Sequence, residues 1–307
     1  MHKIIPGDIP HPKLHQYLLS GIAPRPIALA STIDAEGRPN LSPFSFFNVF
    51  GVNPATLIFS PSRRGRDGST KNTLENIRVV PEVVINVVTY EMVNQVSLAS
   101  TEYPAGVDEF LKAGFSKVPS EIIKPFRVME SPVQLECRVR DLIETGSGGG
   151  AANLVICDIV MVHISETILG EDGAIDQNKI RLVGRMGKDF YVKAFGEALF
   201  EVEKPLRQIG IGIDALPDFI RLSKVLTGNE LGLLGNLERM PSEEEIMAVR
   251  ESPETDLLEF TTQLFDPICV PVQPIKFLKL LSVSARDEFI IGKYLILSAI
   301  IVGAFCG

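Results

Sequence analysis

The sequence is poor in the residues that build disulfide frameworks and local metal sites. It has four cysteines in 307 residues, and they stand far apart along the chain. Neither a metal knuckle nor a closely spaced redox pair is therefore expected, and a small secreted domain would use cysteine far more densely. Residues 1–13 also lack the apolar stretch and the cleavage site of a signal peptide. We expect a cytoplasmic protein. The cysteines are Cys137, Cys157, Cys269 and Cys306.

An excess of basic residues is also missing, since the formal net charge is −8. Proteins that bind nucleic acid need many Lys and Arg side chains to displace the counterions of the phosphates, so we expect no nucleic-acid partner. Two common catalytic motifs are absent as well. No Gly-x-Ser-x-Gly elbow points to an esterase, and no Gly-x-Gly-x-x-Gly follows a predicted strand as it does in a Rossmann domain.

The few histidines do not predict a metal site. His11 and His15 have the spacing of two metal ligands on a helix, but Pro12 lies between them and no third ligand stands nearby. His163 lies in an apolar segment, where a hydrogen-bonded structural histidine is the usual finding. We therefore expect no metal.

One long apolar run, residues 289–306, is interrupted by Lys293. A membrane-spanning helix needs about 20 apolar residues, and the part that follows Lys293 is shorter. A buried terminal helix or strand is the simplest explanation, so a membrane protein is not expected. A membrane anchor and a foreign or misread extension of the gene are the alternatives.

The first two thirds of the chain have the pattern of an antiparallel β-protein. Short β-rich segments fill residues 25–60, and the turn before Gly37 separates two of them, which is typical of a barrel or sandwich. The glycine loop at 146–150 predicts a long hairpin between two further strands. The expected later strands cover residues 83–88, 133–144, 153–166 and 181–185.

Helices are expected between and after these strands. The segment 69–79 predicts a short helix that Ser69 or Thr70 can cap. After about residue 196 the strand signals fade, and segments such as 216–226 and 241–251 look helical. Further helices are expected at 91–100 and 107–113. We divide the chain into a domain at 1–196, a helical extension at 197–252 and a tail of uncertain structure at 253–307.

The start of the helix at 69–79 has the residue types of a phosphate site. A helix N-terminus presents free N–H groups and a partial positive charge, to which Lys71 adds a full charge and Thr73 a hydroxyl donor. A basic cluster, Arg63, Arg64 and Arg66, stands just upstream. An ordinary capped helix after a solvated basic loop is the alternative.

Two other segments suit a flat aromatic cofactor. Ser31 and Thr32 end an apolar strand, where they can bind a polar chain or satisfy their own turn. Ser45, Phe46, Phe47 and Asn48 offer apolar faces and polar partners within four residues. Because successive strand residues point to opposite faces, at least one of the two phenylalanines is expected in the core.

Taken together and in order, several segments resemble the flavin-reductase-like family. The resemblance covers about residues 3–195 and depends on the order and spacing of all the motifs. The matching segments are 25–32 (RPIALAST), 37–40 (GRPN), 41–48 (LSPFSFFN), 71–76 (KNTLEN), 130–137 (ESPVQLEC) and 153–156 (NLVI).

The resemblance implies a mainly β fold with peripheral helices, a Greek-key split β-barrel that binds FMN, or in some members FAD, at a homodimer interface. It implies that Lys71 and Thr73 hold the phosphate. It also implies that the flavin is lined by Ala30, Ser31, Thr32, Ser45, Phe46, Phe47 and Asn48. Many relatives carry Asp where this chain has Asn72, which removes a negative charge beside the phosphate.

Three functions remain open from the sequence. The first is an NADH- or NADPH-dependent flavin oxidoreductase, in which Arg63 or Arg64 meets a phosphate of the dinucleotide and a small molecule or protein accepts the electrons. The second is an FMN electron carrier without nicotinamide activity, which a C-terminal extension folded over the flavin would favour. The third is a non-catalytic cofactor-binding protein.

Overall fold

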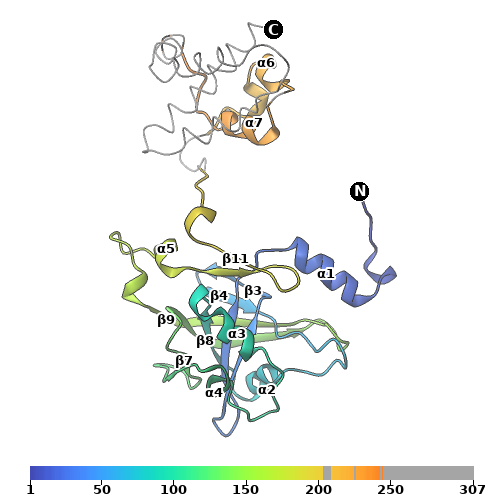
Figure 1. The fold of residues 1–307 in the computed structure, drawn as a ribbon, viewed down its shortest axis with the longest axis vertical. Coiled ribbons are helices and arrows are strands. Elements are labelled where there is room, and N and C mark those ends of the chain that lie inside the picture. Colours follow the sequence, from blue (N-terminus) through green and yellow to red (C-terminus); the bar gives the residue numbers. More distant parts are fainter. Residues whose placement is uncertain (203–208, 225, 243, 245–307) are drawn as a thin grey trace. The chain divides into compact units, whose positions relative to one another are not determined.

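The computed structural model describes residues 1–202, 209–224, 226–242 and 244. The chain divides into two compact units, Met1–Phe200 and Glu201–Gly307 (Figure 1). Both the expected tail at 253–307 and the apolar run at 289–306 lie outside the described residues. Within the described part of the chain, no helix is long and apolar enough to cross a membrane.

The first unit is built on a seven-stranded antiparallel sheet, as the turn-separated β-rich segments predict. Its strand order is β2-β1-β5-β8-β9-β4-β3. The expected long hairpin is present, because β8 and β9 pair along their whole length and the glycine-rich segment at 146–150 joins them. The strands are β1 (Ala28–Ile33), β2 (Pro39–Phe44), β3 (Phe47–Val52), β4 (Ala55–Phe59), β5 (Glu82–Val87), β8 (Val133–Glu144) and β9 (Asn153–Ile164).

Two small antiparallel sheets and several short helices surround this sheet. Strand β10 overlaps the strand expected at 181–185, and helices form where 91–100 and 107–113 predict them. The small sheets are β6 (Lys117–Val118) with β7 (Arg127–Val128), and β10 (Val183–Arg185) with β11 (Tyr191–Lys193). The α-helices of this unit are α1 (His11–Gly21), α2 (Asn72–Val79), α3 (Val93–Ala99), α4 (Glu109–Ala113) and α5 (Gln177–Ile180).

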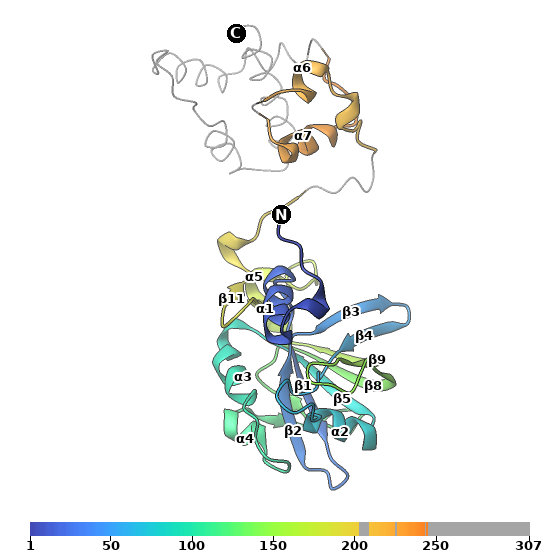
Figure 2. The ribbon, with the colours of Figure 1, turned by 90° about the vertical axis from the view of Figure 1, so that its right-hand side faces the viewer.

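The side-chain alternation of β1 places the sheet between two hydrophobic clusters. Ala28 and Ala30 belong to a cluster that includes Ile77 of α2, while Leu29 belongs to a second cluster with Phe110 of α4. Successive strand residues point to opposite faces, so one strand supplies both clusters. Helix α2 accordingly lies on one side of β1 and β2, and α3 and α4 lie on the other (Figure 2).

Two prolines and a contact with α4 leave the free edge of β2 without N–H groups that could pair with another strand. The N–H of Leu41 donates to Glu109 Oε2 at 3.0 Å instead of to β1, so residues 39, 41 and 43 direct their backbone groups outward. Pro39 and Pro43 have no N–H to offer. An edge without free donors is a poor template for a further strand, and the main sheet ends here.

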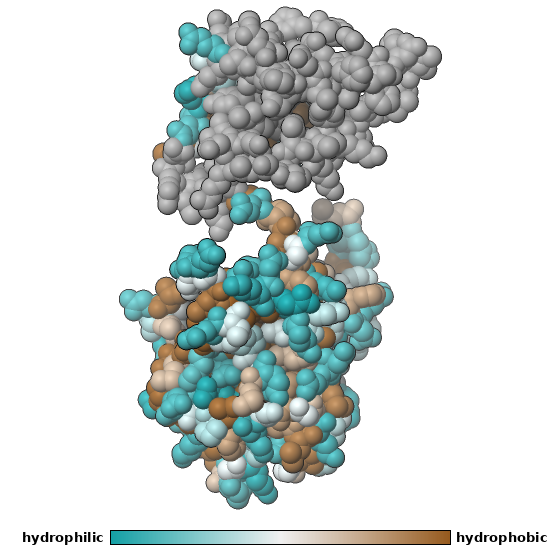
Figure 3. All heavy atoms as spheres, turned by 60° about the vertical axis from the view of Figure 1, so that its left-hand side comes forward, coloured by the Kyte–Doolittle hydropathy of each residue, from teal (hydrophilic) through white to brown (hydrophobic). Residues whose placement is uncertain are grey.

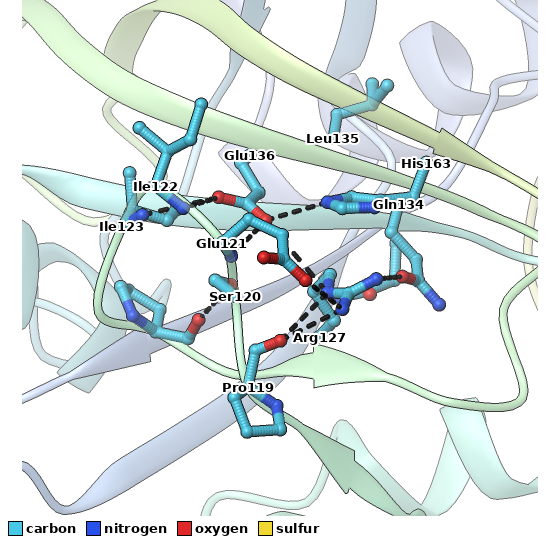
Figure 4. A network of polar contacts seen from close by, with 12 residues as sticks. Pro119, Ser120, Glu121, Ile122, Ile123, Arg127, Gln134, Leu135, Glu136 and His163 are labelled. Atoms are coloured by element: carbon cyan, nitrogen blue, oxygen red, sulfur yellow. Dashed lines mark hydrogen bonds and ion pairs between the residues drawn. The ribbon is translucent and has the colours of Figure 1, made fainter.

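A buried carboxylate, Glu136 on β8, attaches the loop at 119–126 to the outer face of the sheet (Figure 4). Its oxygens accept the backbone N–H groups of Glu121 and Ile122, both at 2.8 Å, and that of Ile123 at 3.3 Å. The imidazole of His163 on β9 lies with Nε2 2.7 Å from Glu136 Oε1. His163 is therefore the hydrogen-bonded structural histidine that its apolar segment predicts.

The second unit contains a small helical core of its own. Helices α6 (Asp218–Arg221) and α7 (Gly228–Gly235) contribute Ile220 and Leu234, and Thr227 and Glu230 form a capping box at the start of α7. The helix expected at 216–226 is thus only four residues long. Most of the one expected at 241–251 lies outside the described residues.

Candidate functional site

A polar pocket opens beside the N-terminus of α2. It is open to the solvent, and its cavity volume is about 30 Å³. Charged and hydroxyl side chains dominate its walls, which come from β2, α2, the loop before α2 and the connection from α3 to α4. The lining residues are Asn40, Ser42, Arg64, Lys71, Asn72, Thr73, Ala99, Ser100, Thr101, Glu102, Tyr103 and Glu109.

The N-terminus of α2 faces this pocket without a side-chain cap. The expectation that Ser69 or Thr70 caps the helix is wrong, because Lys71 occupies the N-cap position. Ser69 instead binds Asp67, and the Thr70 hydroxyl binds Glu75. The first N–H groups of a helix have no intrahelical acceptor, so this end of α2 offers donors and a partial positive charge to the pocket.

Lys71 adds a positive charge to the pocket. It has no ion-pair partner in the described part of the chain, and its ammonium group lies 5.2 Å from the centre of the Phe44 ring. Burial, and next the neighbouring Arg64 guanidinium, lower the pKa of Lys71, while Glu102 partly offsets this change. A lysine whose charged form is disfavoured in this way would gain from an anion in the pocket.

Thr73 is positioned to donate a hydrogen bond. Its hydroxyl oxygen, in an almost fully buried side chain, accepts Asn40 Nδ2 at 3.1 Å. Because the oxygen already accepts, the hydroxyl proton is available to an acceptor such as a phosphate oxygen. Asn40 thus orients Thr73 toward the chemistry that the sequence predicts for it.

The strand residues proposed to line the flavin lie next to the pocket through the β1–β2 pairing. Ala30 is opposite Ser42, and Thr32 is opposite Asn40. The Thr32 hydroxyl oxygen accepts Asn76 Nδ2 from α2 at 3.1 Å. Ser31 points the other way, and its hydroxyl is buried without a hydrogen-bond partner among the described groups. The structure therefore brings Ala30 and Thr32 toward α2, while Ser31 lies on the opposite face.

Ser45 and Phe46 connect β2 to β3, and Phe47 and Asn48 are the first two residues of β3. Phe47 packs against a hydrophobic core cluster and Phe46 is exposed, so one of the two phenylalanines is in the core as expected. Ser45 Oγ accepts Arg25 Nε at 3.3 Å, and Arg25 itself is buried. The segment offers an exposed aromatic ring beside a hydroxyl that is held in place.

Arg63 does not line the pocket. Its guanidinium donates to Glu144 Oε2 at 2.8 Å and to the Gly68 carbonyl at 3.1 Å, so it attaches the loop before α2 to the β8–β9 hairpin. Arg64 faces the pocket instead, with Nε 3.2 Å from Glu102 Oε1. The basic cluster in the sequence predicted an arginine at the phosphate site. Only the geometry of the loop shows that this arginine is Arg64 and not Arg63.

Sequence reasoning missed the residues that other elements bring to the pocket. Asn40 and Ser42 lie in segments that resemble the family, but the sequence assigned them no role in the site. No sequence pattern pointed to Glu102 or Glu109. Burial raises the pKa of Glu109, and the hydrogen bond from the Leu41 N–H offsets part of that rise. These four residues become visible as a group only when β2, α2 and the α3–α4 connection are packed together.

Comparisons with known proteins agree with this fold. The model of the flavin reductase like domain family matches residues 20–181. A protein of Aquifex aeolicus is 34% identical over 189 residues, which cover 62% of this chain and 94% of that protein. The chain therefore belongs to the flavin reductase like domain family.

Solved structures of split-barrel proteins share the fold. Nitrilotriacetate monooxygenase component B from Bacillus cereus is 26% identical, with a TM-score of 0.61 over 66% of this chain and 98% of that one. A Shewanella frigidimarina protein, named as a flavin reductase with a split barrel domain, is 23% identical. Its TM-score is 0.57 over 66% of this chain and 99% of that one. The first unit is thus a mainly β, split-barrel domain with peripheral helices.

Proposed function

We propose that the chain is a cytoplasmic, homodimeric oxidoreductase that binds FMN and takes hydride from NADPH or NADH. Family membership supports flavin chemistry in general. The observation that carries the choice of a mononucleotide is the convergence of Lys71, Arg64 and the uncapped N-terminus of α2 on one pocket. Two cations and a helix N-terminus suit the dianionic phosphate of FMN, so FAD is the less favoured cofactor.

In this proposal the phosphate is held by four kinds of donor. These donors are the backbone N–H groups of Asn72 and Thr73 at the start of α2, the Thr73 hydroxyl, the Lys71 ammonium and the Arg64 guanidinium. Charge-assisted hydrogen bonds of this kind are roughly twice as strong as neutral ones. Loss of the two cations would therefore affect FMN far more than riboflavin, which lacks the phosphate.

The residues from Ser45 to Asn48, with Ala30 and Thr32, are proposed to line the isoalloxazine and ribityl groups. Ser31 is left out of this lining, because its buried side chain points to the opposite face of β1. When bound, FMN supplies the hydride-accepting centre, so the chain needs no acid–base pair of its own. Arg25 fixes the Ser45 hydroxyl, and Phe46 gives an exposed apolar face that can shield a ring from water. We retain Arg63 only as a candidate contact for the dinucleotide, because Glu144 already engages it.

The proposal predicts a yellow protein that a nicotinamide bleaches. The visible absorption spectrum of the purified full chain, loaded with FMN, should show oxidised-flavin bands that disappear within seconds of anaerobic addition of NADPH or NADH. Bands that persist would contradict the reductase and favour an FMN electron carrier. A chain that shows no flavin bands even after FMN is added would contradict flavin binding itself.

The Bacillus cereus relative suggests the kind of electron acceptor. By its name, that protein is one component of a monooxygenase. A protein that reduces flavin for a separate oxygenase needs no acceptor site of its own beyond the flavin pocket. We therefore include a partner oxygenase, beside small molecules, among the proposed acceptors.

The homodimer is proposed to form through the β3–β4 hairpin, at the β3 end of the main sheet. Four apolar side chains are exposed there: Phe46 just before β3, and Val49, Phe50 and Val52 on it. The relative solvent exposure of Phe50 is 65%. Such an apolar group on an edge strand is typical of a protein–protein interface. Figure 3 shows one face of this unit, on which hydrophobic residues are interspersed among hydrophilic ones.

Replacement of Phe50 by aspartate is expected to convert the dimer to monomer, because a charge would be buried in an apolar interface. Light scattering coupled to size exclusion should give twice the 33.6 kDa chain mass for the parent and one chain mass for Phe50→Asp. Leu111→Asp, at an exposed apolar residue of α4, is the matched control and should stay dimeric. A monomeric parent, or a dimeric Phe50→Asp, would contradict the proposal.

A further inference from the structure

The proposed phosphate pocket contains an anion of its own. Glu102, in the connection between α3 and α4, lies with Oε1 3.2 Å from Arg64 Nε and with Oε2 3.0 Å from a terminal nitrogen of Arg66. The carboxylate thus bridges two arginines of the loop before α2. Glu102 is about half exposed, whereas Arg64 retains only 17% of its side-chain exposure.

A site that served only to bind phosphate would not place a carboxylate beside its cations. A phosphate in the pocket would meet Lys71 and Arg64, yet Glu102 already neutralises Arg64 and also lines the wall. Like charges at short range in a partly buried site repel each other with little screening. The other contacts of Arg64, with Ser69 Oγ at 3.3 Å and with the Thr70 carbonyl, hold its guanidinium at the pocket without help from Glu102.

Resting on the proposed function, we propose that Glu102 is an internal competitor for the phosphate of FMN. It occupies Arg64 when no phosphate is bound, and phosphate must displace it from that guanidinium. The carboxylate therefore weakens FMN binding and keeps the flavin exchangeable, as a dissociable substrate must be. If Glu102 acted only through its charge at a distance, its effect on FMN binding would not depend on Arg64.

The dissociation constants of FMN and riboflavin, measured by quenching of flavin fluorescence with the full chain, test this inference. Glu102→Gln keeps the shape and a hydrogen-bond acceptor but removes the charge. The variant should bind FMN about tenfold more tightly than the parent, which is a typical effect of one nearby charge. It should bind riboflavin as tightly as the parent does. Glu102→Ala should change FMN binding in the same direction.

Two further variants show whether the effect acts through Arg64. In an Arg64→Gln background, Glu102→Gln should tighten FMN binding by less than about threefold, because the guanidinium for which Glu102 and the phosphate compete is absent. Glu91→Gln is the matched control. Glu91 pairs with Arg181 near the start of α3 and does not line the pocket, so its variant should match the parent for both flavins.

The outcomes separate this inference from the proposed function. FMN affinity that is unchanged or weaker in Glu102→Gln, or riboflavin affinity that rises equally, would overturn the role of Glu102 while leaving flavin binding in place. If the parent binds neither flavin, the proposed function fails, and the competitor role fails with it.

Discussion

Replacement of Lys71 by methionine should weaken FMN binding about 30-fold, since a hydrogen bond to a charged group is worth about 2 kcal/mol. Riboflavin should bind the variant and the parent nearly equally, because it has no phosphate to lose. The physical reason is that Lys71 is the one pocket cation without a carboxylate partner among the described residues. Methionine keeps most of the apolar stem and removes the ammonium group, which lies 5.2 Å from the centre of the Phe44 ring.

The measurement is a pair of titrations, FMN and riboflavin, followed by flavin fluorescence. Lys71→Arg retains the charge and should lose less affinity than Lys71→Met. Lys13→Met, at an exposed lysine of α1, controls for the general loss of one positive charge. Equal weakening of both flavins would point to damage of the pocket as a whole, and unchanged FMN binding would place the phosphate elsewhere.

Replacement of Glu136 by glutamine should lower the free energy of unfolding by about 3 kcal/mol, the usual cost of breaking a buried charged network. Glutamine offers one acceptor oxygen and an NH₂ group, whereas the three backbone N–H groups donate to both oxygens of Glu136 and all need acceptors. At least one buried donor would then be left unsatisfied. The loop at 119–126 is expected to detach first.

Denaturant unfolding of the parent and Glu136→Gln measures the difference. Glu130→Gln is the matched control, because Glu130 also accepts a backbone N–H, that of Ser116, but is exposed. Its effect should stay within about 0.5 kcal/mol, as for most surface changes. Equal stabilities of Glu136→Gln and the parent would mean that water replaces the lost contacts.

The same carboxylate predicts a pH dependence. Burial alone would raise the pKa of Glu136, but the backbone hydrogen bonds from Glu121 and Ile122 and the contact with His163 outweigh it and hold the pKa below its ordinary value. The folded state then binds this proton less readily than the unfolded chain. Its contribution to stability is complete above the ordinary glutamate pKa of 4.5 and is lost as the pH falls toward the lower folded value. Glu136→Gln should lack this part of the acid dependence.

Much of the first unit could be predicted from local sequence. The β-rich segments at 25–60, the paired strands around the glycine loop and the helix at α2 follow from periodicity and turn residues, which act between near neighbours. The helix start itself pointed to Lys71 and Thr73 as phosphate ligands, and the resemblance added the family and the cofactor. Even here the start of α2 was placed three residues early, because the turn at 64–69 takes Ser69 for its own hydrogen bonds.

Only the tertiary structure decided which side chains meet. Asn40 reaches Thr73, and Glu102 reaches Arg64, across 33 and 38 residues of chain. The selection of Arg64 over Arg63 depends on the β8–β9 hairpin, which supplies Glu144 to Arg63. The burial of Glu136 depends on a loop that folds back over β8.

The sequence by itself determined the strands of the main sheet, the long hairpin, the family and the kind of chemistry at the start of α2, but not the short strands β6, β7 and β11. Each of these is encoded by residues a few positions apart or by motifs in a fixed order. The composition of the pocket, and the carboxylate within it, came from the packing of β2, α2 and the α3–α4 connection. Contacts of this kind depend on strand register and helix placement, which no local pattern specifies.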